Sequence, residues 1–317
     1  ETTHAEEYAR QVIEAAAKRR LRDHLTVFLQ DCSEGNKPAL ELLANMQEKA
    51  QAEQARLTAG EQEIFPCLRL KDILDYTPPP DHALAGDGWL RRGAGCLLTG
   101  GTGLGKSVLA EQIAVSITAG IKILGCIPVH SAYRVLYVQA EKDEETLKRD
   151  VQAIINNAEG KPCRLLVQTN LCIFHVYGIA GNEFAKWLAE KTQKTRPDLI
   201  VIDPYQAYLG GMVDINSSAC FLSWIQPVNR IIRDNNCGLL LVAHTPKPKD
   251  RETWTARESV YMAAGSSAIS NWTRTSAELT AADEETGRYR LRFGKNAERT
   301  GLINDQGGIV RDLFIEH

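Results

Sequence analysis

The chain has 317 residues, 44% hydrophobic and 24% charged, which excludes a largely disordered chain and a collagen-like repeat. Its 37 basic and 40 acidic side chains give a net charge of −3, so a nucleic-acid site would have to be a local patch. The eight cysteines form no CxxC pair, which excludes a zinc ribbon, and no apolar run is long enough to span a membrane. Scattered thiols in a chain of this length indicate a reducing compartment, so we expect a cytoplasmic protein, with no membrane partner. The sequence lacks an initiator Met, and we expect that further residues precede it.

Residues 1–75 are expected to form an N-terminal helical arm. Apolar residues at helical spacing predict one helix over 8–30 and a second over 38–57. The Pro-rich segment at 76–81 predicts an extended boundary before a core at 80–317. A basic cluster in the first helix is either a solvated face or a contact for a partner or nucleic acid. Its members are Lys18, Arg19, Arg20 and Arg22.

Short apolar runs alternate with helical segments from Gly95 onward. Strands are predicted over 95–99, 134–140, 199–202 and 238–243, and helices over 105–119, 143–157, 182–194 and 217–235. This alternation predicts an α/β fold with a mainly parallel sheet covered on both faces. The closely spaced runs at 276–281, 288–294 and 309–315 predict an antiparallel C-terminal extension.

A glycine-rich motif, GxxxxGK[ST], lies between the first core strand and its helix, which is the context that a phosphate-binding loop requires. Glycines let backbone N–H groups approach phosphates, and the helix N-terminus adds partial positive charge. Lys106 would reach the β- and γ-phosphates of ATP, and Ser107 would supply an oxygen to Mg²⁺. The predicted nucleotide contacts are Gly100, Gly101, Thr102, Gly103, Leu104, Gly105, Lys106, Ser107 and Val108.

Asp203 ends a hydrophobic strand, in the Walker B arrangement, and is predicted to orient Mg²⁺ through water. The next residue, Pro204, cannot accept a proton, so a general base must come from another element. Glu141, at the end of the strand over 134–140, is the candidate. Glu144 and Glu145 are expected to be solvated charges in the first turn of the next helix.

His244 ends a further buried strand, where its side chain could bond the γ-phosphate or the attacking water and report hydrolysis. The loop that follows interleaves basic residues with an aromatic ring, a pattern suited to single-stranded DNA, although its acidic residues equally fit an exposed mixed-charge loop. Its candidate DNA contacts are Lys247, Lys249, Arg251 and Trp254. A second candidate DNA-facing loop spans 209–216.

Three cations near the C-terminus are candidates for action across a subunit boundary. Lys295 and Arg299 form the predicted trans pair, and Arg274 precedes the C-terminal strands. Cations supplied by a neighbouring subunit would stabilise charge that develops on the γ-phosphate.

Over residues 80–317 the chain resembles the RepA-type hexameric replicative helicases of plasmids and the broader RecA/DnaB-like ATPases. The motifs that carry the resemblance are the 100–107 loop, Glu141, Asp203, His244, Gly265-Ser-Ser with Arg274, Lys295, Arg299, Gly301 and the lead-in at 88–95. The resemblance implies a RecA-like P-loop core in which Glu141 polarises the attacking water. It also implies an origin in a mobile genetic element, a homo-hexameric ring with nucleotide between subunits, single-stranded DNA in the channel, and an initiator or loader protein as a partner.

Two functions remain open at this point. One is a ring motor that couples ATP hydrolysis to movement on single-stranded DNA. A replicative helicase is the most specific form of this function. The other is an ATP-dependent assembly or loading switch without unwinding activity, since one fold serves both. The near-neutral composition favours the switch, whereas Glu141, His244 and the basic loop favour the motor.

Overall fold

The computed structural model describes residues 2–35, 38–58, 69–158, 160–210, 218–245, 267–283 and 287–316. Contacts within the chain form two compact units, Glu1–Thr77 and Pro78–His317. None of the helices in the described ranges combines the length and apolar character needed to cross a membrane.

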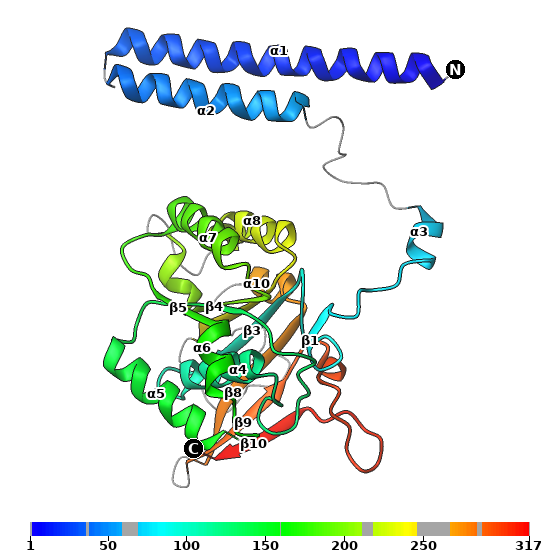
Figure 1. Ribbon diagram of the computed structural model, residues 1–317, viewed down its shortest axis with the longest axis vertical. Coiled ribbons are helices and arrows are strands. Elements are labelled where there is room, and N and C mark those ends of the chain that lie inside the picture. Colours follow the sequence, from blue (N-terminus) through cyan, green and yellow to red (C-terminus); the bar gives the residue numbers. More distant parts are fainter. Residues whose placement is uncertain are drawn as a thin grey trace. The chain divides into compact units, whose positions relative to one another are not determined.

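The first unit contains helices α1 (Thr2–Glu34), α2 (Ala39–Thr58) and α3 (Leu70–Leu74). Helices α1 and α2 pack side by side as a hairpin (Figure 1), with Leu42 buried. The apolar side chains of Leu21, Leu25 and Leu29 are 39–59% exposed. Because a two-helix hairpin covers only part of each helix, these apolar side chains stay partly exposed.

The second unit is built on one eight-stranded sheet in the order β10-β9-β8-β3-β7-β6-β4-β5, preceded by a small antiparallel pair of β1 and β2. Strands β3, β4, β5, β6, β7 and β8 run parallel, and β9 and β10 run antiparallel to their neighbours. The strand bounds are β1 Ala83–Ala85, β2 Leu90–Arg91, β3 Gly95–Gly100, β4 Val135–Gln139, β5 Leu171–His175, β6 Leu199–Asp203, β7 Gly238–His244, β8 Thr275–Asp283, β9 Arg288–Phe293 and β10 Asp312–Glu316.

Helices cover both faces of the sheet, as Figure 1 shows. Successive strand residues point to opposite faces, so Leu98 packs with α4 while Leu97 packs with α7 and α8. Helices α5 and α6 contact α4 on its own side of the sheet, and α10 lies against α8 on the other. The helical bounds are α4 Lys106–Ala119, α5 Glu144–Asn157, α6 Arg164–Asn170, α7 Gly181–Thr195, η1 Tyr205–Tyr208, α8 Ser218–Asp234, α10 Ser267–Trp272 and η2 Ala297–Thr300.

The predicted α/β class with a mainly parallel sheet is confirmed, and two details differ from the prediction. The first strand of the C-terminal extension, β8, is parallel to β3, and only β9 and β10 continue the sheet in antiparallel fashion. The edge strand β5 was not predicted. Its apolar run at 171–174 is comparable to that of β4, so the sequence does carry the signal for this strand.

The central strands should dominate the stability of the second unit. Leu241 of β7 is fully buried between helices and strands, so Leu241→Ala should lower the free energy of unfolding by about 2–5 kcal/mol. Leu222→Ala on α8, where Leu222 is 44% exposed, should change it by less than about 0.5 kcal/mol. Urea unfolding followed by tryptophan fluorescence tests this, since all five Trp residues lie in the second unit. Equal losses in the two variants would contradict this packing.

Candidate functional site

Four parallel strands bring the predicted site residues to one edge of the sheet. Strand β7 lies between β3 and β6, and β4 lies beside β6. The register pairs Gly100 with His244 and Gln139 with Asp203. The phosphate loop, His244, Asp203 and Glu141 therefore all lie at the carboxyl ends of adjacent strands, where open α/β sheets bind ligands.

The phosphate loop joins β3 to α4. Gly105 immediately precedes α4 with φ of 84°, a conformation that side chains disfavour, so a glycine is needed there. The Lys106 side chain is buried, and its Nζ donates a hydrogen bond to the Gly101 carbonyl at 2.7 Å. Burial lowers the pKa of Lys106, and the nearby Asp203 and Glu141 oppose that shift. A buried cation held inside a glycine loop is suited to an anionic ligand.

Asp203 is buried, and only one of its two carboxylate oxygens accepts a hydrogen bond from the described residues. Tyr137 donates its hydroxyl to Asp203 Oδ2 at 2.7 Å, while Oδ1 has no hydrogen-bond partner among the described residues. Burial raises the pKa of Asp203, and the hydroxyls of Tyr137 and Ser107 oppose the rise. An orphaned carboxylate oxygen near a serine hydroxyl fits an oxygen-liganded Mg²⁺ whose other ligands are water and phosphate. The described residues hold no group of three His, Cys, Asp or Glu side chains that would bind a metal ion alone.

Glu141 and His244 face each other across the edge. His244 Nε2 lies 3.4 Å from Glu141 Oε1, and Glu141 is 56% exposed. Within the described ranges His244 Nδ1 is buried without a hydrogen-bond partner, and Gln206 Nε2 donates to the His244 carbonyl oxygen at 3.3 Å. The half-exposed Glu141 carboxylate remains open to water. Glu144 and Glu145 lie in the first turn of α5, as expected.

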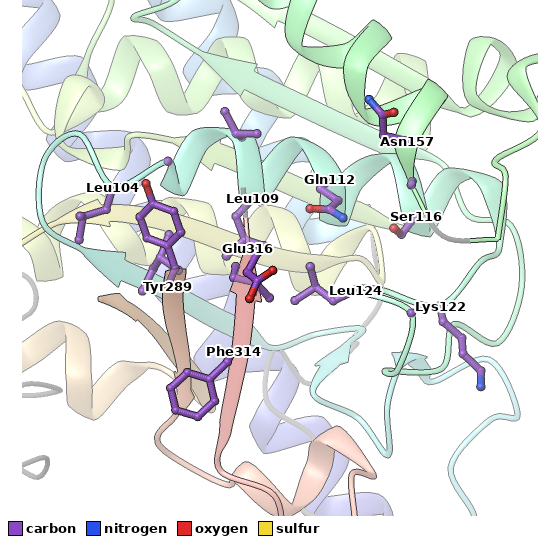
Figure 2. Close-up of a pocket in the computed structure, with 16 residues that line it drawn as sticks. Leu104, Leu109, Gln112, Ser116, Lys122, Leu124, Asn157, Tyr289, Phe314 and Glu316 are labelled. Carbon is purple, nitrogen blue, oxygen red and sulfur yellow. The ribbon is translucent and has the colours of Figure 1, made fainter. Parts of the chain in front are cut away.

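A pocket of about 330 Å³ lies beside the phosphate loop (Figure 2). Leu104, Gly105 and Val108 line it on the loop side, and Tyr289 and Phe314 line it from β9 and β10. Figure 2 shows the Tyr289 phenol pointing toward Leu104 and the start of α4. The pocket is therefore continuous with the loop, and its volume falls within the range of small-molecule sites, about 300–1,000 Å³. No motif in the sequence points to Tyr289, which reaches the pocket only through the pairing of β9 in the sheet.

The three C-terminal cations lie at the opposite end of the sheet. The Arg274 N–H donates to the Gly95 carbonyl at the start of β3, about 17 Å along the strand from the loop. Lys295 Nζ donates to the carbonyls of Ser270 and Asn271, each at 3.3 Å. Arg274, Lys295 and Arg299 therefore do not approach the phosphate loop of their own chain.

Arg91 lies near Arg299 and Arg274, and no motif in the sequence points to it. Burial lowers the pKa of Arg91, and the nearby Arg299 and Arg274 lower it further. Within the described residues, Arg91 Nε and Arg299 Nη1 are buried without hydrogen-bond partners. No spacing rule predicts this cluster, since β2 and η2 approach each other only in the folded chain. Lys247, Lys249, Arg251 and Trp254 lie outside the described residues, as does most of the 209–216 loop.

A family model described as an AAA domain (AAA_25) matches residues 61–250, which is more than half of the chain. The chain belongs to this family of P-loop ATPases. The match includes the phosphate loop, Glu141, Asp203 and His244, and it ends before Arg274, Lys295 and Arg299. A search of curated proteins found no matching sequence. The family supports nucleotide binding with the usual Mg²⁺ dependence and ATP hydrolysis in general.

Tyr137 should control how the ATPase uses Mg²⁺. Tyr137→Phe removes the hydrogen bond that orients Asp203, and the loss of such outer-shell partners costs about 10- to 100-fold in metal affinity. We expect the Mg²⁺ concentration for half-maximal ATP hydrolysis to rise about tenfold. A Mg²⁺ titration at saturating ATP measures this, with Tyr133→Phe, in the same unit, as the control. An unchanged Mg²⁺ requirement would contradict the assigned role of the Tyr137–Asp203 bond.

Proposed function

We propose that this P-loop ATPase is a ring motor on single-stranded DNA, of the RepA/DnaB-like replicative helicase type. The observation that carries the proposal is the convergence of the phosphate loop, Asp203, Glu141 and His244 on one edge. In this arrangement Lys106 holds the phosphates, and Glu141 accepts a proton from the attacking water. Mg²⁺ at Ser107 and Asp203 would neutralise phosphate charge. His244, in contact with Glu141, would respond to loss of the γ-phosphate.

The cation cluster supports the ring. Burial lowers the pKa of Arg91, and Arg299 and Arg274 lie close enough to lower it further. Like charges at short range are costly without an anion. Because the cluster is remote from the loop of its own chain, a triphosphate bound to a second copy is the anion that the proposal assigns to it. Nucleotide would then lie between subunits, and a homo-hexamer would carry six such sites.

Action on DNA rests on the sequence of the loop after His244, with Lys247, Lys249, Arg251 and Trp254 as the proposed contacts. An initiator or loader protein would be its partner. The alternative is an ATP-dependent assembly or loading switch, which the net charge of −3 favours.

The motor predicts ATP hydrolysis that single-stranded DNA stimulates strongly and that depends on Glu141. Glu141→Gln should lower kcat about 10²- to 10⁴-fold, because the amide cannot accept a proton. Glu144→Gln, an exposed change in the first turn of α5, is the matched control and should keep the wild-type rate. Steady-state ATPase assays with and without single-stranded DNA measure both effects. Wild-type turnover that ignores DNA would favour the switch, and full activity of Glu141→Gln would place the base elsewhere.

The pocket beside the loop is proposed to hold the adenine base of ATP, with Tyr289 as its stacking surface. Base–aromatic stacking contributes about 1–3 kcal/mol, so Tyr289→Ala should raise the Kd for ATP about 5- to 150-fold. Inorganic triphosphate, which has no base, should bind wild type and variant alike, and Tyr289→Phe should keep the ATP affinity. Competition binding with both ligands tests this. Equal losses for ATP and triphosphate would show that Tyr289 acts on the loop rather than on the base.

A further inference from the structure

Lys142 directly follows Glu141 in the turn between β4 and α5. The Gln139 side chain bonds both its backbone N–H and its backbone carbonyl. The Lys142 N–H donates to Gln139 Oε1 at 2.8 Å, and Gln139 Nε2 donates to the Lys142 carbonyl at 2.9 Å. Gln139 is itself buried at the end of β4. One side chain therefore satisfies both backbone groups of the residue after the proposed base.

The Lys142 side chain joins three elements. Its Nζ lies 2.6 Å from Glu111 Oε1 on α4 and 3.0 Å from Asp150 Oδ2 on α5. Glu111 is 2% exposed and lies one helical turn after Ser107. Lys142 thus ties the turn that carries Glu141 to the helix whose N-terminus forms the phosphate loop.

Burial of the Glu111–Lys142 ion pair costs desolvation free energy. Burial raises the pKa of Glu111 to about 7 although Lys142 opposes the rise. Glu111 Oε2 has no hydrogen-bond partner in the part of the chain that the structure describes. Burial alone would lower the pKa of Lys142, but the bonds to Glu111 and Asp150 more than offset it. Replacement of a buried ion pair by apolar residues is often neutral or stabilising. Stability alone is therefore a poor explanation for this pair.

Glu141 needs an external restraint. Its side chain is 56% exposed, and the 3.4 Å approach to His244 is its one ion pair within the part of the chain that the structure describes. A base must be placed to within a fraction of an ångström of the attacking water, and a misplacement of about 1 Å costs about 10²-fold in rate. Lys142 follows Glu141 in the chain, and its backbone is held by Gln139. Among the described hydrogen bonds, the bond from Lys142 to Glu111 is the one that connects this turn to α4.

We propose that Lys142 is a positioning residue, which holds Glu141 at a set distance from the phosphate loop through its contact with Glu111. The inference rests on the proposed function, in which Glu141 is the base. Asp150 supports the Lys142 ammonium from α5.

Lys142→Met should lower kcat for ATP hydrolysis about 10- to 100-fold while the Kd for ATP changes less than about threefold. The described hydrogen bonds and ion pairs of Lys142 go to Gln139, Glu111 and Asp150 and not to residues of the phosphate loop, so ATP binding should survive. Lys148→Met, which removes an exposed lysine from α5, is the matched control and should keep kcat and stability. A Lys142→Met enzyme with wild-type kcat, or one that loses ATP affinity and kcat equally, would overturn the proposal.

The double variant Lys142→Met/Glu111→Leu separates positioning from stability, and it remains testable if Lys142→Met folds poorly. With both charges removed, resistance to urea should return to the wild-type level, because no uncompensated Glu111 carboxylate remains. The kcat should stay low, since the polar link to α4 is still broken. Recovery of kcat together with stability would show that the pair is only structural.

Adding Lys142→Met to Glu141→Gln distinguishes failure of this inference from failure of the proposed function. If Lys142 acts through Glu141, the second substitution should lower kcat less than twofold further. A further 10-fold loss would overturn the positioning role while leaving Glu141 as the base. If Glu141→Gln alone keeps full activity, the base assignment fails, and the positioning role fails with it.

Discussion

The side-by-side burial of β3, β7, β6 and β4 is the constraint on which the rest of the structure depends. Both faces of these strands are covered by helices, and their residues are nearly all apolar. Charged groups are therefore excluded from the strand interiors and can occur only where strands end. Because the strands are parallel, those ends meet at one edge, and the phosphate loop, Glu141, Asp203 and His244 are brought together there.

The same edge carries several charges that are removed from water. Burial lowers the pKa of Lys106 and raises the pKa values of Asp203 and Glu111. Lys106 and Asp203 form no direct hydrogen bond or ion pair among the described residues, so each keeps capacity for a ligand, which is consistent with an anionic group and a cation at this edge. The arginine cluster at the far end of the sheet has the same character. The chain thus presents a phosphate site at one end and cations at the other, which supports the proposed head-to-tail ring.

The sequence predicts which residues lie at the carboxyl ends of the strands, because each motif directly follows its own strand in the chain. The 100–107 loop, Asp203 and His244 each sit at the end of an apolar run, and strand–helix alternation alone then implies a shared edge. Contacts between distant segments could not be predicted in this way. Tyr137 and Asp203 are 66 residues apart, and Lys142 and Glu111 are 31 apart. Arg91 approaches Arg274 and Arg299 only through tertiary packing.

Calorimetric titration of ATP, with and without Mg²⁺, tests most directly whether this edge is a Mg²⁺–ATP site. The account predicts that wild type binds ATP more tightly with Mg²⁺, that Asp203→Asn loses this gain, and that Lys106→Met loses binding in both conditions. Loss of affinity should reach about tenfold or more for Lys106→Met, since a charge-assisted contact to phosphate contributes about 1.5–3 kcal/mol. ATP binding that is unchanged by both substitutions would contradict the account.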